Sequence, residues 1–155
     1  MNRMLLMHLI SCQSKLIFQK GNIDIHLLEK FKALEINLGG SVCNSDYKAA
    51  MTEVLKFTQK LHIENWIVDA RDSDRFPIRL DNWHLNFYGT ELPKTDVRKI
   101  ARIASYHFHY ETNISLLITS LIKKTNPPYS FQYKADTNEA LEWFMENRTS
   151  GKIKG

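Results

Sequence analysis

The stretch Asn65-Trp66-Ile67-Val68-Asp69-Ala70-Arg71-Asp72-Ser73 decides the fold of this chain. Its first half contains a continuous apolar run, which is typical of a strand covered on both faces, as in a parallel sheet. Its second half is an acidic, polar turn at the carboxyl end of that strand. In α/β proteins, ligands and partners usually bind at this end of the sheet. The stretch therefore predicts a central strand and the edge of the sheet that carries function.

Alternating patterns precede this strand. Residues 23–27 and 33–38 alternate between apolar and polar with a period of two, and Gly39-Gly40 ends the second run. The first third of the chain therefore predicts an antiparallel meander. Apolar residues then recur at three- and four-residue steps over 47–58, which predicts a helix capped by Asn44 or Ser45.

After the central strand, helical and strand patterns take turns. This alternation predicts an α/β fold with a mixed sheet, in which an N-terminal antiparallel meander is followed by alternating helices and strands. We expect one domain over 15–147, an N-terminal extension over 1–14 and a basic polar tail over 148–155. The expected later elements are a helix from Pro77 that stops at Gly89, a strand over 100–108, a helix over 114–122, a strand over 131–133 and a helix that starts near Asp136.

The charge pattern argues against nucleic-acid binding. The 155-residue chain has a formal net charge of +4, but Arg148, Lys152 and Lys154 concentrate three positive charges in the tail. The rest of the chain holds 18 basic and 17 acidic residues, without a dense basic run or interleaved aromatics. No apolar run reaches the roughly 20 residues that span a bilayer. We therefore expect neither a nucleic-acid partner nor an integral membrane segment.

The cysteines and the N-terminus bear on the compartment. Cys12 and Cys43 lack the close spacing of a zinc site or a disulfide framework, which fits a reducing, cytoplasmic compartment. Leu9-Ile10-Ser11-Cys12 looks like the cleavage box of a bacterial lipoprotein. The apolar run before it is at the lower limit for a signal core, so we favour an extra strand or an apolar arm on the domain.

Several of these stretches resemble the SpoIIAA-like fold, which includes the STAS domains and small bacterial proteins related to them. The similarity covers about residues 15–144, and its motifs are structural. They are Gly39-Gly40 before a long amphipathic helix, Trp66-Ile67-Val68-Asp69-Ala70-Arg71, Trp83, Ile100-Ala101-Arg102-Ile103-Ala104, and Phe131 followed by Glu139-Ala140-Leu141-Glu142-Trp143-Phe144.

The resemblance implies a non-catalytic binding or regulatory module that contacts another protein in bacterial signalling. STAS domains of the anti-sigma-factor antagonist type are switched by phosphorylation of a serine just after the central strand. Here Ser73 follows the strand at a different offset, between Asp72 and Asp74, which would repel an added phosphate. The expected partner surface comprises Asp69, Arg71, Asp72, Ser73, Asp74, Arg75 and Trp83.

Catalytic and metal chemistry has weaker support. Asp69, Asp72 and Asp74 could bind a cation, but the Gly and distal Glu of a calcium loop are missing, and nearby arginines favour local ion pairs. On a strand, His107 and His109 would share one face, and Asp69 or His84 could approach them in space. An enzyme that uses His107, His109 and Asp69 is therefore a second alternative. We expect no metal and no cofactor.

The aromatic residues support a different alternative. Trp83, Phe87, Tyr88, Tyr106 and Phe108 are many for a short region. They would line a pocket for a small apolar ligand or lipid, form a homodimer patch, or simply pack in the core, and the sequence leaves these three readings open.

Overall fold

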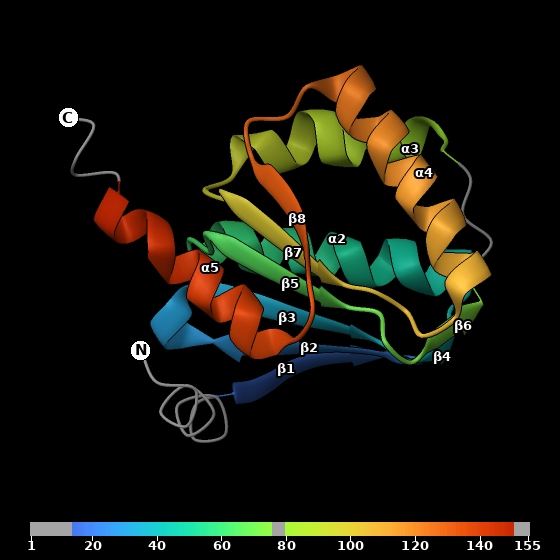
Figure 1. Cartoon of the computed structure of the whole chain (residues 1–155), viewed down its shortest axis with the longest axis horizontal. Helices are drawn as coiled ribbons and strands as arrows, with labels where there is room; N and C mark the ends of the chain where they lie inside the picture. The colour runs from blue at the N-terminus through green and yellow to red at the C-terminus, as the bar shows by residue number, and fades with distance from the viewer. Residues whose placement is uncertain (1–13, 76–79, 151–155) are drawn as a thin grey trace.

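A six-stranded sheet forms the centre of the structure, a computed structural model that describes residues 14–75 and 80–150 (Figure 1). The strand order across the sheet is β1-β2-β3-β5-β7-β8, which puts β3 and β5 in the middle. The strands are β1 (Ser14–Lys20), β2 (Ile23–Leu28), β3 (Ala33–Leu38), β5 (Asn65–Asp69), β7 (Lys99–Ile103) and β8 (Ser130–Lys134).

The first three strands form the predicted antiparallel meander. β1 pairs with β2 and β2 with β3, both antiparallel. A bulge between Leu16 and Phe18 interrupts the register of β1, the edge strand. The tight connection from β2 to β3 is the 3-10 turn Glu29–Phe31.

The other strands pair in parallel, as the apolar run around Trp66 predicts. β5 lies between β3 and β7, and β8 follows β7. The Trp66 side chain is fully buried, and its indole N–H donates to the Thr58 hydroxyl at 3.1 Å. Burial of the large ring therefore leaves no indole donor unpaired.

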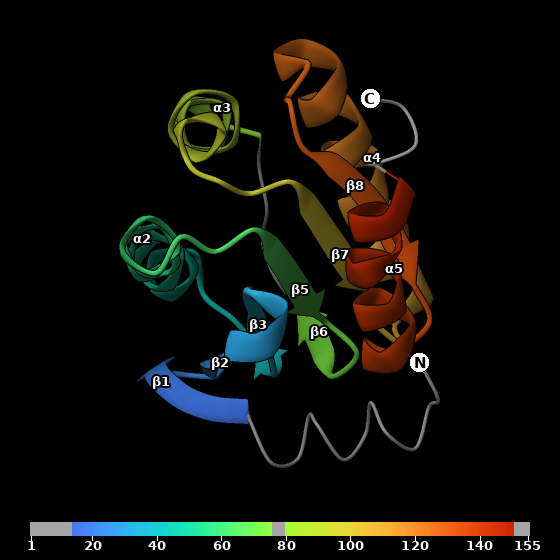
Figure 2. The same cartoon turned by 90° about the vertical axis from the view of Figure 1, so that its left-hand side faces the viewer.

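Three helical segments cover one face of the sheet and one helix covers the other (Figures 1 and 2). This follows from the strand order, since successive right-handed crossovers in one direction place their helices on the same face. On the second face, Ala140 and Leu141 pack against Ile67 and Ala101. The helices are α2 (Asn44–Lys60), α3 (Asn82–Asn86), α4 (Phe108–Thr125) on the first face and α5 (Thr137–Ser150) on the second.

The turn after the central strand contains an element that the sequence patterns did not predict. Ser73–Arg75 forms a short strand, β6, which pairs in parallel with β4 (Gly40–Ser41). Gly40 has a φ of +51°, a conformation that favours glycine. The predicted stop at Gly39-Gly40 is therefore correct, because β3 ends at Leu38 and the chain turns there.

Two helix boundaries differ from the prediction. The residue that caps α2 is Cys43, and its side chain makes no capping hydrogen bond, so the predicted cap at Asn44 or Ser45 is wrong. The helix expected to stop at Gly89 continues as a π-helical turn, Phe87–Glu91, and a 3-10 turn, Leu92–Lys94. In contrast, the expected start near Asp136 is confirmed, since its carboxylate accepts the Glu139 N–H at 2.8 Å.

The predicted strand over 100–108 is also too long. β7 ends at Ile103, and α4 begins at Phe108. Tyr106 between them, and Phe108 and Tyr110 just after, favour a strand by propensity. However, Glu111 lies in the first turn of α4, where a carboxylate stabilises the start of a helix.

Some predictions lie outside the described residues. These are the Leu9-Ile10-Ser11-Cys12 motif, Pro77 itself and the part of the expected tail beyond residue 150. The helix expected from Pro77 starts later than predicted, since α3 begins at Asn82 and the Asp81 side chain caps it. α5 runs to Ser150, so residues 148–150 of the expected tail are helical. Within residues 14–75 and 80–150, no helix has both the length and the apolar character needed to cross a bilayer.

Candidate functional site

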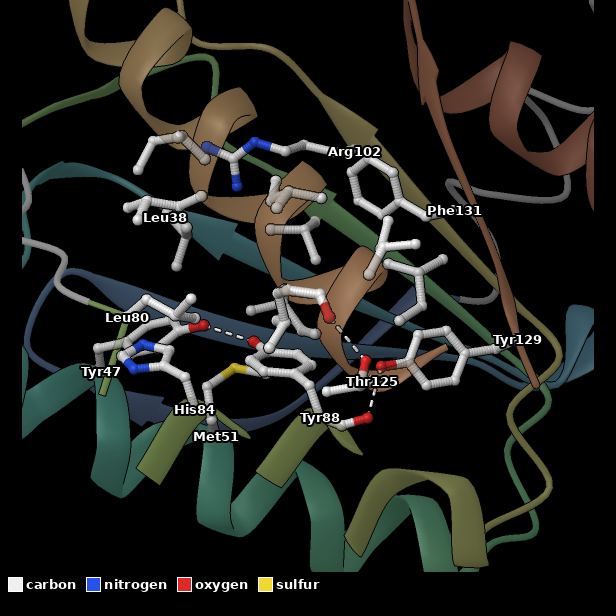
Figure 3. A pocket seen from close by; sticks show the side chains of 18 of the residues that line it. Leu38, Tyr47, Met51, Leu80, His84, Tyr88, Arg102, Thr125, Tyr129 and Phe131 are labelled. Carbon is white, nitrogen blue, oxygen red and sulfur yellow. Dashed lines mark hydrogen bonds between the residues drawn. The ribbon is translucent and has the colours of Figure 1, made fainter. Parts of the chain in front are cut away.

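An apolar cavity of about 110 Å³ lies between the first face of the sheet and the three helical segments that cover it (Figure 3). Side chains of β3, β5, β7 and β8 line it on the sheet side. Leu117, Ile118 and Leu121 of α4 line it from the opposite side and are only half-buried. A mainly apolar cavity of this size can hold a small apolar molecule.

The second helical segment contacts α2, the residue before β8 and α4, and these contacts border the cavity. The Tyr129 hydroxyl donates to the Tyr88 carbonyl at 2.7 Å, and the Tyr47 and Tyr88 hydroxyls bond to each other (Figure 3). A Cβ atom on Gly89 would lie 2.6 Å from Cγ2 of Thr125, the last residue of α4. Only glycine therefore permits this close approach of α4 to the π-helical turn.

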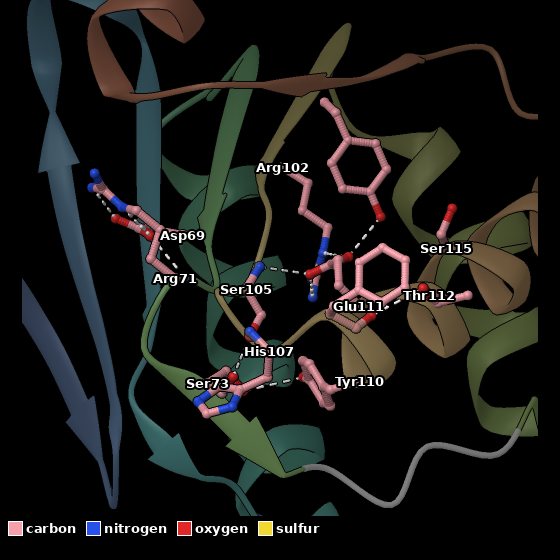
Figure 4. Close-up of polar contacts among 12 residues, drawn as sticks. Asp69, Arg71, Ser73, Arg102, Ser105, His107, Tyr110, Glu111, Thr112 and Ser115 are labelled. Atoms are coloured by element: carbon pink, nitrogen blue, oxygen red, sulfur yellow. Dashed lines mark hydrogen bonds and ion pairs between the residues drawn. The ribbon is translucent and has the colours of Figure 1, made fainter.

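A buried ion pair holds the other end of α4. The Arg102 guanidinium donates to both carboxylate oxygens of Glu111, at 2.9 and 3.1 Å (Figure 4). The same carboxylate accepts the Ser105 N–H at 2.8 Å and the Tyr133 hydroxyl at 2.6 Å. Arg102 also lines the cavity. The cavity wall thus contains a positive charge that an adjacent carboxylate already neutralises.

This arrangement keeps both partners ionised. Burial alone would raise the pKa of Glu111, but the bonds and charge of Arg102 hold that pKa below its ordinary value. Burial likewise opposes the charge on Arg102. The hydrogen bonds and the negative charge of Glu111 outweigh this effect of burial, so the pKa of Arg102 is raised. Burial, followed by the bond to Glu111, raises the pKa of Tyr133 to about 12. Tyr133 therefore remains a neutral donor at physiological pH.

A chain of hydrogen bonds connects this ion pair to the turn after the central strand. The Ser105 hydroxyl donates to the Ser73 carbonyl, and the Ser73 hydroxyl donates to the Tyr110 hydroxyl at 3.1 Å (Figure 4). Ser73 is fully buried. The expectation that its side chain belongs to an exposed partner surface is therefore wrong, since β6 turns it inward.

The rest of the expected partner surface is mixed in exposure. The Asp69 carboxylate accepts three hydrogen bonds from Arg71, among them one from the guanidinium at 2.7 Å. This pairing raises the pKa of Arg71, and it outweighs burial, which acts in the opposite direction. Asp72 and Asp74 are exposed, and the Arg75 side chain lies outside the described part. The Asp74 carboxylate accepts the Ser41 hydroxyl at 3.1 Å, and a partner could reach both exposed carboxylates.

The predicted pocket aromatics separate into three groups. Tyr88 lines the cavity. Trp83 and Phe87 stack on each other, with ring centroids 4.9 Å apart, and pack on the core beside it. Tyr106 and Phe108 are 75% and 77% exposed, so their expected place in the pocket is wrong. The reason is the early start of α4, which turns the segment around them out to solvent.

The early start of α4 also means that His107 and His109 do not form the expected pair. His107 precedes α4 and His109 lies in its first turn, so they do not share a strand face. The hydrogen bonds of Asp69 go to Arg71 rather than to a histidine. Across 14–75 and 80–150, no three His, Cys, Asp or Glu side chains are grouped to hold a metal ion.

A pair that sequence reasoning missed is Asp81 with His84. The Asp81 carboxylate caps α3 by accepting the His84 N–H at 3.1 Å, and the same oxygen lies 2.7 Å from His84 Nδ1. Bonding by Lys48, followed by the bonds from His84, lowers the pKa of Asp81. The Asp-x-x-His spacing at a helix start could have indicated this pair.

The similarity of this chain to known proteins is distant. Neither protein-family models nor curated proteins match the chain. A crystal structure of an uncharacterised protein of the DUF3478 family from Shewanella loihica PV-4, described as SpoIIAA-like, is similar at 17% identity. The match has a TM-score of 0.46 and covers 72% of this chain and 83% of that one. At this identity the likeness assigns no activity, ligand or partner.

Proposed function

We propose that this protein is a non-catalytic binding module that holds a small apolar ligand in the cavity beneath α4. The observation that carries the proposal is the cavity itself, whose wall is almost entirely aliphatic and aromatic. Close-packed interiors rarely leave such a space, because unfilled apolar volume is destabilising. A ligand that fills it would replace the missing contacts.

The size of the cavity limits the ligand. A volume of about 110 Å³ is comparable to the engineered cavities of about 150 Å³ that bind benzene, and it is below the usual range for drug-sized ligands. We therefore propose a ligand, or an inserted part of one, no larger than a small ring or a short alkyl chain.

A toluene titration followed by NMR tests the proposal. Toluene should shift the resonances of residues that line the cavity, such as Ile100 and Ile118. Leu117→Trp fills the cavity from α4 and should abolish this response. Leu116→Trp is the matched control, because Leu116 is the next residue on the same helix but is 66% exposed. Unchanged toluene binding by a folded Leu117→Trp variant would place the ligand elsewhere.

A protein partner is the second candidate, and a specific surface favours it. Tyr106, Phe108 and Leu116 are exposed large hydrophobic residues around the start of α4. Phe108 and Leu116 line a shallow groove with Tyr133. Such apolar surface often marks a protein interface, either with another protein or with a second copy of the chain. The exposed Asp72 and Asp74 would add charge to this contact.

Sedimentation and pull-down experiments with paired variants test this candidate. Phe108→Ser should weaken self-association or partner capture and leave stability within about 0.5 kcal/mol, because the ring is mostly exposed. Asp72→Lys tests the acidic turn separately. If neither variant alters the sedimentation profile or the captured proteins, this surface has no role in binding.

A further inference from the structure

One residue of the cavity wall has a buried nitrogen without a hydrogen-bond partner. His84 lines the cavity and is only 5% exposed. Its Nδ1 lies 2.7 Å from Asp81 Oδ1. Its Nε2 is buried and is, among the described residues, the one buried side-chain polar atom without a hydrogen-bond partner. Buried polar groups are nearly always paired, so an unpaired one at a cavity calls for an explanation.

The surroundings of His84 fix the position of its ring. Asp81 holds Nδ1, and Lys48 Nζ in turn donates to the other Asp81 oxygen at 2.9 Å. The ring also stacks against Tyr47, with centroids 6.0 Å apart and planes 21° apart. Because an ionised carboxylate accepts the proton on Nδ1, the neutral imidazole carries an unshared electron pair on Nε2.

We propose that the ligand of this cavity is a small alcohol or phenol whose hydroxyl group bonds to His84 Nε2. This inference rests on the proposed function and specifies the class of ligand. A hydroxyl group suits both states of the ring, since it donates to the neutral imidazole and accepts from the imidazolium. The apolar wall then surrounds the hydrocarbon part of the molecule.

A carboxylate ligand fits the cavity less well. The other ionic group on the wall is Arg102, and Glu111 engages its guanidinium through two bonds. An added carboxylate would enter an apolar space beside a carboxylate that is already there. Among the described lining residues, both groups that can carry a positive charge already face a carboxylate, Arg102 with Glu111 and His84 with Asp81, so neither would fully offset the desolvation of the added charge.

Three probes of similar shape test the inference: toluene, phenol and benzoate. Each is titrated against the wild type and His84→Phe, which keeps an aromatic ring but removes Nε2. We expect phenol to bind the wild type more tightly than toluene or benzoate. The preference for phenol over toluene should fall about tenfold in His84→Phe, the amount that one hydrogen bond contributes.

The outcomes separate this inference from the proposed function. Toluene binding with the same phenol preference in both proteins would overturn the hydroxyl contact and leave the apolar site standing. Tightest binding of benzoate would also overturn it. If none of the three probes binds, both the hydroxyl contact and the proposed apolar site are refuted.

A measurement on the wild type is independent of the folding of His84→Phe. The ¹⁵N resonance of Nε2 should change with phenol, as a bonded nitrogen requires, and change much less with toluene. An equal response to the two probes would overturn the inference.

Discussion

The Arg102 guanidinium and the Glu111 carboxylate form a two-bond ion pair that connects the end of β7 to the first turn of α4. Both side chains are buried. Arg102 lies in the stretch over 100–108 that the sequence predicts as one strand, Glu111 lies beyond it, and their pairing ties the start of α4 to β7. Position and orientation of the helix over the cavity therefore depend on two charges that the chain buries together.

Glu111→Gln should destabilise the protein by about 3 kcal/mol, since it leaves the buried Arg102 charge without its partner. The amide retains the size of the side chain, so lost packing contributes little. Chemical denaturation of this variant and of Glu29→Gln, an exposed glutamate, measures the difference. The control should change stability by less than about 0.5 kcal/mol. A similar small effect for Glu111→Gln would show that the pair is not important for stability.

The pH dependence of stability should report the same carboxylate. Because the folded-state pKa of Glu111 lies below its ordinary value of 4.5, its contribution is present above that value. The contribution is lost as the pH falls through the lower folded-state pKa. Denaturation between about pH 6 and pH 2 should therefore show a shallower acid loss in Glu111→Gln than in the wild type. Parallel curves would contradict this assignment.

Gly89→Ala should destabilise the protein by about 1–2 kcal/mol, because the new Cβ meets Cγ2 of Thr125. Thr125→Ser removes that methyl group and keeps the hydroxyl, which bonds to the Leu121 carbonyl at 2.8 Å. The double variant should recover part of the loss in thermal denaturation. Additive effects of the two substitutions would mean that the contact is not the cause.

Ser73→Asp should destabilise the protein by at least about 2 kcal/mol, since it places a carboxylate at a fully buried position. Ser45→Asp is the control, at an exposed site in the first turn of α2 where a negative charge is favourable. Comparison of their unfolding midpoints tests whether phosphate could be accepted at Ser73. A stable Ser73→Asp variant would reopen the phosphoserine hypothesis.

The sequence predicts the sheet well because hydrophobic periodicity is a local signal. The alternation before Gly39 and the apolar run at Trp66 are both sufficient to define their strands. The start of α4 could not be predicted in this way. Its aromatic residues favour a strand, and the opposing influence is the contact of Glu111 with Arg102, nine residues away.

The candidate site is less predictable, since it depends on which side chains the fold brings together. Asp72 could be recognised as exposed from its polar turn. His84 could not be identified as a cavity residue, because its environment comes from separate elements. Tyr47 of α2 and Arg102 of β7, for example, line the same space. Cavity formation is a property of imperfect packing between elements, and no short motif encodes it.

The bulge between Leu16 and Phe18 affects how the chain can associate with copies of itself. β1 is an edge strand, and a straight edge offers free backbone groups on which another molecule can add a strand. A bulge bends and twists the strand, and the flanking Lys15 and Lys20 add charge along it. This edge is therefore protected against sheet extension and aggregation, and it disfavours the addition of a strand beside β1 by a second copy of the chain.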